Sequence, residues 1–108
     1  ECDVKPTFLG STDPGVFLQK WVYAYLHYPA EAVRQGIHGR VLVDFLIDEK
    51  GNVKDAHVLK GVHPLLDEEA VKVVGASPRW KPGKVRGKPV ISEVSLYVEF
   101  ILERRKNR

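Results

Sequence analysis

The chain has 108 residues, which is enough for one domain and too few for two independent cores. Hydrophobic residues make up 44% and charged residues 29%, a composition that excludes a disordered polyelectrolyte and a disulfide-rich scaffold. The net charge of +3 lies in the tail after Leu102, because the first 102 residues hold 13 basic and 13 acidic side chains. The absence of methionine indicates a mature or truncated piece of a longer protein.

A single domain is expected at residues 12–102, with an extended lead-in at 1–11 and a basic tail at 103–108. The lead-in shows no periodicity, so we expect little order there. The lone cysteine, Cys2, has no partner for an internal disulfide and no neighbouring motif for redox chemistry or metal binding.

Two helices are expected at the start of the domain. Thr12 or Asp13 before Pro14 combines a capping residue with a proline at the first helical position. The apolar residues that follow recur at helical spacing and predict a helix from Pro14 to near His27: Phe17, Trp21, Val22, Tyr25 and Leu26. After Pro29, residues 30–35 favour a short second helix that Gly36 ends.

After Gly36 the apolar residues recur at every second position, which is typical of strands. Val41, Val43, Phe45 and Ile47 alternate with polar residues that include Asp44, so we expect a strand with one buried face. Residues 48–51 match a type I turn that ends in glycine. A second strand is predicted over 52–60, with a bulge between Val53 and Ala56 where the apolar parity changes.

A helix that begins at Pro64 and a long last strand complete the predicted fold. The helix has an apolar stripe at Leu66, Ala70, Val73 and Val74. A loop is expected over 79–88, whose basic residues either keep it soluble or meet an anionic partner. The last strand runs from about Ile91 to Leu102. The prediction is an α+β fold in which a three-stranded antiparallel sheet packs on helices, in the order α-α-β-β-α-β.

No residue pattern indicates catalysis. The four histidines lack zinc-ligand spacing, and the serines lie in no nucleophile motif. The glycines form no phosphate-binding loop, and only Tyr97 among the aromatic residues is expected on an outward strand face, where RNA-binding sheets carry several. We therefore expect no enzyme activity, no catalytic residue, no metal, no cofactor and no nucleic acid.

The last strand of the sheet is expected to have a free edge. This edge could accept an added strand, or the lead-in or the charges of Glu93, Glu99 and Glu103 could protect it; the residues leave both open. Replacing Leu96 with proline removes a backbone N–H donor from this strand and is expected to abolish the binding of an added peptide strand. An exposed edge could also pair two copies as a homodimer.

Short motifs in a fixed order carry a family resemblance: Tyr28-Pro29, Gly39-Arg40-Val41, Asp48 with Gly51, Leu66-Asp67 with Ala70, and residues 78–83 (Pro-Arg-Trp-Lys-Pro-Gly). Over residues 8–102 the sequence resembles the C-terminal domain of TonB-type energy transducers. The structural roles agree, since Gly39 allows a close approach and Trp80 can cap the core.

The resemblance implies a non-enzymatic periplasmic domain of an inner-membrane-anchored protein. A proton-driven motor complex of that membrane would act on it through the preceding part of the protein. Its partners would be TonB-dependent outer-membrane transporters, whose TonB box peptide adds as a strand to the last strand. Carried over, the partner-binding residues are Tyr28, Pro29, Val94, Ser95, Leu96, Tyr97 and Val98. The alternative is a TonB-like extracytoplasmic sensor or interaction module of another membrane protein.

Overall fold

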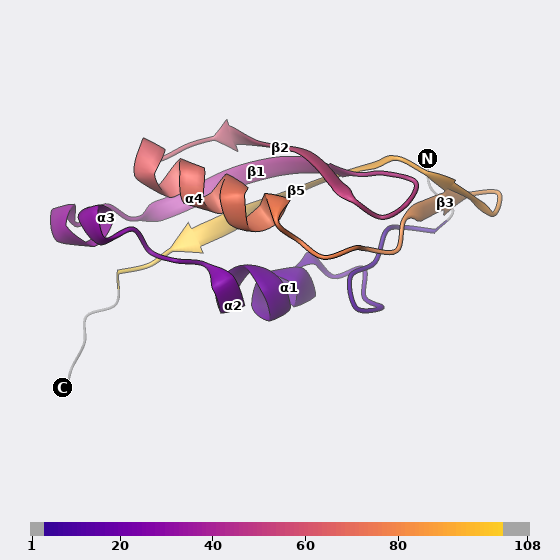
Figure 1. The fold of residues 1–108 in the computed structure, drawn as a ribbon, viewed down its shortest axis with the longest axis horizontal. Helices are drawn as coiled ribbons and strands as arrows, with labels where there is room; N and C mark the ends of the chain where they lie inside the picture. The colour runs from indigo at the N-terminus through magenta and orange to yellow at the C-terminus, as the bar shows by residue number, and fades with distance from the viewer. Residues whose placement is uncertain (1–3, 103–108) are drawn as a thin grey trace.

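The computed structural model describes residues 4–102 of the chain. Cys2 and the basic tail at 103–108 lie outside this range, so the predictions for them stay predictions. The described chain forms helical segments, two strands, a helix, a short hairpin and a last strand, which confirms the α+β class (Figure 1). The hairpin is an addition to the predicted order of elements.

The first helical segment comprises α1 (Pro14–Phe17), a π-helical turn η1 (Leu18–Val22) and α2 (Tyr23–Tyr25). Its predicted start is confirmed, because the Asp13 carboxylate accepts a hydrogen bond of 2.9 Å from the Gly15 N–H. Sequence periodicity predicts one continuous α-helix here, and the π turn departs from that prediction.

The π turn η1 changes which side chains face the core. A π turn inserts an extra residue into a helix and so shifts the phase of the residues that follow it. Phe17 and Val22 are both fully buried, although they are five residues apart. Tyr25 is 63% exposed instead of belonging to the predicted stripe. Trp21 anchors the segment, since its indole N–H donates to the Val73 carbonyl at 2.8 Å.

The second helix, α3 (Ala30–Gln35), has the predicted bounds. Pro29 precedes it in an extended conformation, and Gly36 ends it with φ of 71°, in the left-handed region that glycine tolerates best. The Ile37 N–H donates to the Ala32 carbonyl at 2.9 Å across this turn. The chain is thereby directed into the sheet.

The sheet has three antiparallel strands in the order β2-β1-β5. β1 (Gly39–Ile47) is central, with β2 (Val53–Lys60) on one side and β5 (Ser92–Phe100) on the other. β1 and β5 pair along their whole lengths without a register shift. The predicted buried face of β1 is confirmed, because four side chains on it are fully buried: Val41, Val43, Phe45 and Ile47.

The turn between β1 and β2 and the bulge in β2 both follow the prediction. The Asp48 carbonyl accepts from the Gly51 N–H at 2.9 Å. Gly51 has φ of 87°, and a Cβ there would lie 1.8 Å from the Trp80 carbonyl oxygen, so glycine is required. The pairing of β2 with β1 shifts around Asp55, whose φ of 54° marks the bulge.

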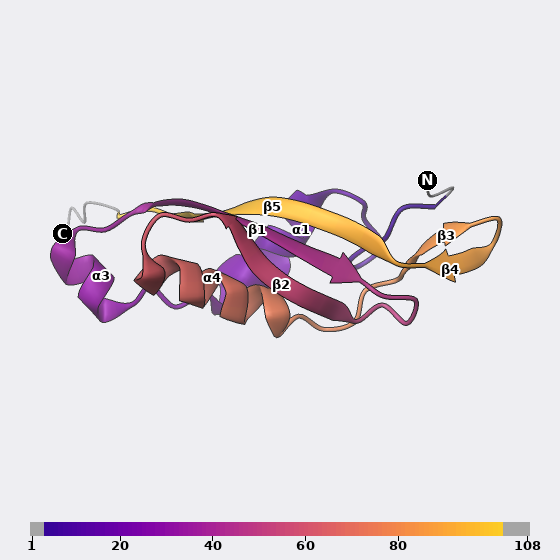
Figure 2. The ribbon, with the colours of Figure 1, turned by 90° about the horizontal axis from the view of Figure 1, so that it is seen from above.

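Helix α4 (Pro64–Gly75) covers one face of the sheet, where it contacts β2 and β1 (Figure 2). Its predicted stripe is confirmed, because all four members are buried: Leu66, Ala70, Val73 and Val74. The first helical segment joins the same core, with the Phe17 ring centroid 6.0 Å from that of Phe45. We call the opposite face the open face; it carries Arg40, Leu42, Asp44 and Leu46 of β1 and Glu93, Ser95, Tyr97 and Glu99 of β5.

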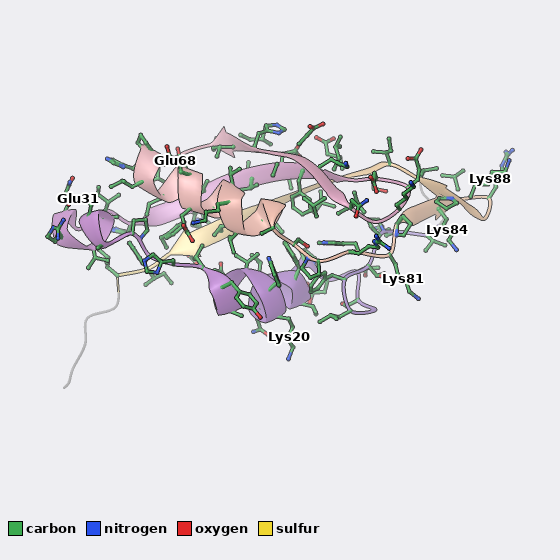
Figure 3. The ribbon with its side chains drawn as sticks, in the orientation of Figure 1. Lys20, Glu31, Glu68, Lys81, Lys84 and Lys88 are labelled. Carbon is green, nitrogen blue, oxygen red and sulfur yellow. The ribbon has the colours of Figure 1, made fainter. Side chains whose placement is uncertain are left out.

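The basic stretch is not the expected loop. It folds as a hairpin of β3 (Gly83–Val85) and β4 (Lys88–Val90), and Figure 3 shows Lys81, Lys84 and Lys88 at this end of the molecule. Residues of the lead-in pair with it, since the Val4 and Lys84 N–H groups donate to each other's carbonyl at 3.0 and 2.8 Å. Strands of three residues leave no alternation in the sequence, which explains why periodicity missed them.

The lead-in also contributes to the core. Phe8 is 4% exposed, and its ring lies 4.9 Å from that of Phe17 and 5.4 Å from that of Trp80. Trp80 is itself buried, which confirms its predicted position as a cap of the core. Residues before the first helix are therefore ordered by aromatic packing.

Candidate docking edge of the sheet

β5 has one strand partner and one free edge. It pairs with β1 on one side, and residues 4–102 place no strand on its other side. The Glu99 N–H donates to the Tyr23 hydroxyl at 3.0 Å, so this N–H points away from β1. Backbone groups of a regular strand alternate in direction. The N–H groups of Glu93, Ser95 and Tyr97 therefore point outward with that of Glu99.

The outward N–H groups of β5 differ in whether a hydrogen-bond acceptor already occupies them. Tyr23 occupies the Glu99 N–H, whereas no residue in the described part of the chain accepts from the N–H of Ser95 or Tyr97. Unpaired donors and acceptors on a strand edge are a template for another extended chain. The middle of β5 therefore has the groups that an added strand needs.

The predicted stretch 94–98 divides into two sets. Leu96 and Val98 are 6% and 0% exposed, and their backbone groups face β1, so neither their side chains nor their N–H groups are available to a partner. Ser95 and Tyr97 have side chains on the open face and backbone groups at the free edge. Val94 is half-buried and borders a hollow at the start of the strand.

A buried acid lies on the open face beside this edge. Asp44 is only 3% exposed, although sequence parity places it among polar, solvent-facing residues. The Ser95 hydroxyl donates to Asp44 Oδ1 at 2.5 Å, and His57 Nε2 lies 3.7 Å from Asp44 Oδ2. Because the serine is bound to the acid and not to the histidine, the three residues do not form a nucleophile with its base.

Glu93 completes the polar cluster. Its pKa is raised above the ordinary value, because its carboxyl shares a hydrogen bond with Asp44 and lies in the negative field of that group. The protonated form of Glu93 is therefore favoured beside Asp44. The cluster fixes the Ser95 side chain, and this position on β5 is the middle of the free edge.

The structure brings Tyr28 to the other end of β5. Its hydroxyl donates to the Ile37 carbonyl, and its ring meets that of Phe100 edge-on at 5.3 Å. Partial burial raises the pKa of the Tyr28 phenol. Pro29 is half-buried next to it and begins α3. Tyr28 and Pro29 therefore lie beside the end of β5 and not beside Ser95.

Two hollows flank the free edge. One of about 540 Å³ lies at the end of β5. It is lined by Tyr23, Leu26, Tyr28, Glu99, Phe100 and Ile101. The other, of about 620 Å³, lies at the start of the strand, and its lining includes Lys5, Pro6, Thr12, Pro14, Trp80 and Val94. Sequence reasoning missed Tyr23 and the lead-in residues, because only the fold carries them to the edge.

Residues 4–102 contain no group of three side chains placed to hold a metal ion. Within the same range no helix has the length and apolar character needed to cross a membrane.

The fold and this edge define a class: an α+β domain whose helices cover one face of a three-stranded antiparallel sheet and leave the edge of the last strand free. The family described as Gram-negative bacterial TonB protein C-terminal matches residues 24–102, and the chain belongs to this family. The resemblance inferred from the sequence is confirmed.

Known relatives agree with this assignment. Protein TonB of Pseudomonas aeruginosa is 33% identical over 79 residues, which span 73% of this chain and 23% of that protein. The solution structure of the Pseudomonas aeruginosa TonB C-terminal domain has a TM-score of 0.63 at 27% identity, over 98% of this chain and 93% of that one. A Helicobacter pylori TonB C-terminal domain shares the fold, with a TM-score of 0.68 at 23% identity over 90% and 89% of the two chains.

Proposed function

We propose that this chain is the periplasmic domain of a TonB-type energy transducer. It binds the TonB box peptide of outer-membrane transporters as an added strand on β5 and passes on force derived from the proton gradient of the inner membrane. The observation that carries the proposal is the pair of outward N–H groups at Ser95 and Tyr97, which no described residue uses. Membership of the TonB C-terminal family supports it.

Strand addition suits a domain that has to bear force. A pull along an added strand loads several backbone hydrogen bonds in parallel, each worth about 0.5–1.5 kcal/mol net. β5 is in turn joined to β1 by nine residue pairs, and β1 lies at the centre of the sheet. The load would therefore pass from the peptide into the core without depending on one contact.

Tyr28 and Pro29 are proposed as a second contact near the end of β5. The Tyr28 side chain lines the hollow at this end, so a bound peptide that continues past the strand would meet it. Its hydroxyl and ring are also tied to Ile37 and Phe100, which gives the contact a rigid base. An inner-membrane anchor and a proton-driven motor complex would act through the part of the protein that precedes this domain.

An NMR titration tests the docking proposal. The isotope-labelled chain is titrated with peptides copied from the periplasmic N-termini of the host's outer-membrane transporters, at two salt concentrations. We expect saturable amide shifts at Ser95 and Tyr97, with smaller ones around Tyr28, and little change with salt, because the contacts are backbone hydrogen bonds.

Two results would contradict this function. Shifts confined to the basic hairpin at Lys84 and Lys88, and lost at high salt, would indicate electrostatic binding of an anionic partner instead. The absence of any shift with every transporter peptide would favour a sensor or interaction module of another membrane protein.

A further inference from the structure

The Tyr23 hydroxyl occupies a position that an added strand would need. It accepts the Glu99 N–H at 3.0 Å, the usual length for a hydrogen bond between an amide and an oxygen. In an antiparallel or parallel ladder, the carbonyl oxygen of the added strand would take this place. Tyr23 and a peptide therefore compete for the same donor.

The backbone that carries Tyr23 is firmly held. The preceding residue, Val22, is fully buried, and the Trp21 indole N–H is bonded to the Val73 carbonyl at 2.8 Å on α4. The Leu26 N–H donates to the Val22 carbonyl at 2.8 Å, which closes the end of the helical segment. Tyr23 is therefore held beside β5, because moving this backbone would disrupt the core.

Tyr23 closes the π turn and faces the sheet edge. Within η1 the Tyr23 N–H donates to the Leu18 carbonyl, five residues back, so the side chains after this turn are rotated relative to a regular α-helix. Tyr23 reaches β5 whereas Tyr25, two residues on, is 63% exposed. The residue that closes the irregular turn is thus the one that contacts Glu99.

We propose that Tyr23 is a stop that limits strand addition to the part of β5 from Glu93 to Tyr97 and thereby sets the register of the added strand. This inference rests on the proposed docking at β5. Register matters because a slip of one residue moves every side chain of the added strand to the opposite face. Because Tyr23 occupies the Glu99 N–H, the unpaired part of the edge ends at Tyr97. The end of the peptide strand is expected to align with this point.

Replacing Tyr23 with phenylalanine tests the stop, since this change removes only the hydroxyl. The matched control is Tyr25→Phe on the same helical segment, where the hydroxyl makes no contact with β5. In the free protein we expect the Glu99 amide to exchange slowly with solvent in the wild type and the control, and at least several-fold faster in Tyr23→Phe. This first measurement needs no peptide.

The second measurement uses transporter peptides from the titration, lengthened by one or two residues at either end. In the wild type and in Tyr25→Phe, residues that extend past Tyr97 are expected to leave the Glu99 N–H bonded to Tyr23 and to add only the affinity of their contact with Tyr28. In Tyr23→Phe, the same extension reaches the Glu99 N–H and is expected to tighten binding about 2- to 10-fold, the effect of one backbone hydrogen bond. Protection of the Glu99 amide on binding should accompany this gain.

The outcomes separate the two proposals. If peptides protect Ser95 and Tyr97 but the wild type also pairs Glu99 with the peptide and gains the same affinity from extension, the stop is wrong and docking stands. If no peptide protects Ser95 or Tyr97 in any of the three proteins, docking at β5 is wrong, and the stop with it. Equal exchange of Glu99 in the free wild type and Tyr23→Phe overturns the stop alone.

Discussion

At the scale of single residues, Asp44 shows how a polar position in a strand can be buried. Its parity places it on the open face of β1, where the sequence predicts contact with solvent. Neighbours on β2 and β5 cover it instead, because His57 and Ser95 lie opposite it across the sheet. A carboxylate this buried requires hydrogen-bond partners, and the Ser95 hydroxyl supplies one.

The raised pKa of Glu93 predicts a pH dependence of stability. The folded protein holds this proton more tightly than the unfolded chain does, because Asp44 stabilises the protonated form. The free energy of unfolding is therefore expected to decrease as pH rises from the ordinary value of 4.5 through the raised pKa. Glu93→Gln is expected to lack this decrease and to be more stable than the wild type at neutral pH. Chemical denaturation in steps across this window measures both effects.

The control for this prediction is Glu99→Gln, which removes a carboxylate from the same face of β5 at a position opposite Arg40 instead of Asp44. It is expected to keep the wild-type fall in stability with pH above 4.5. A Glu93→Gln variant whose stability falls over this window as steeply as that of the wild type would show that the raised pKa of Glu93 is not the cause of the fall.

At the scale of elements, the backbone N–H groups of β5 alternate between the edge that pairs with β1 and the free edge. The N–H groups of Leu96 and Val98 join β5 to β1, whereas those of Ser95 and Tyr97 face the free edge. Proline at Leu96 would therefore break the sheet instead of the docking site, which corrects the expectation drawn from the sequence. The direction of a backbone group depends on which neighbour the strand pairs with, and the sequence pattern does not contain this information.

This alternation predicts opposite results for prolines at neighbouring positions. Tyr97→Pro removes an outward N–H, a change that edge strands tolerate, so we expect a retained fold, a stability loss of about 1–2 kcal/mol and no peptide binding. Leu96→Pro removes a bond to β1 and a core side chain and is expected to cost about 3 kcal/mol or more. Circular dichroism and calorimetric titration distinguish the two effects.

Tyr97→Ala is the matched control for the edge proline. It deletes the same ring, which lies 4.7 Å from the Arg40 guanidinium, but keeps the N–H. It is expected to bind peptide with at most a modest loss of affinity. If Tyr97→Pro folds and binds as well as Tyr97→Ala, the backbone of Tyr97 takes no part in docking.

At the scale of the whole molecule, the basic residues of the hairpin and the free edge are separate features. Lys81, Lys84 and Lys88 gather at the hairpin end, whereas Glu31 and Glu68 lie toward the other end (Figure 3). The middle of β5, where Ser95 and Tyr97 lie, carries no basic side chain. Binding at the edge is for this reason expected to depend little on salt.

A free edge also predicts self-association. Two copies can pair β5 with β5 across a two-fold axis through the same outward groups, from Glu93 to Tyr97. We expect a weak, concentration-dependent dimer in sedimentation experiments, and we expect Tyr97→Pro to remain monomeric at the same concentrations. A wild-type protein that stays strictly monomeric to high concentration would rule out this pairing.

Much of this protein is determined by local patterns in its sequence. The period-two alternation specifies β1 and β5, the 3.6-residue stripe specifies α4, and Asp13, Gly36 and Gly51 mark ends and turns that the structure confirms. These features depend on neighbours a few residues apart, so the chain contains the information directly. The order of short motifs indicated the TonB C-terminal family, and this resemblance is the reason for proposing that a peptide docks on the last strand.

The tertiary structure alone decided which groups meet. Contacts such as Tyr23 with Glu99, Asp44 with Ser95 and Phe8 with Trp80 join residues more than 50 positions apart. The direction of the Tyr97 N–H likewise depends on the pairing of β5 with β1, whose residues lie far from it in the sequence. The sequence therefore predicts β5 as a strand. Which of its N–H groups are unpaired, and that Tyr23 occupies the one at Glu99, is known only from the tertiary structure.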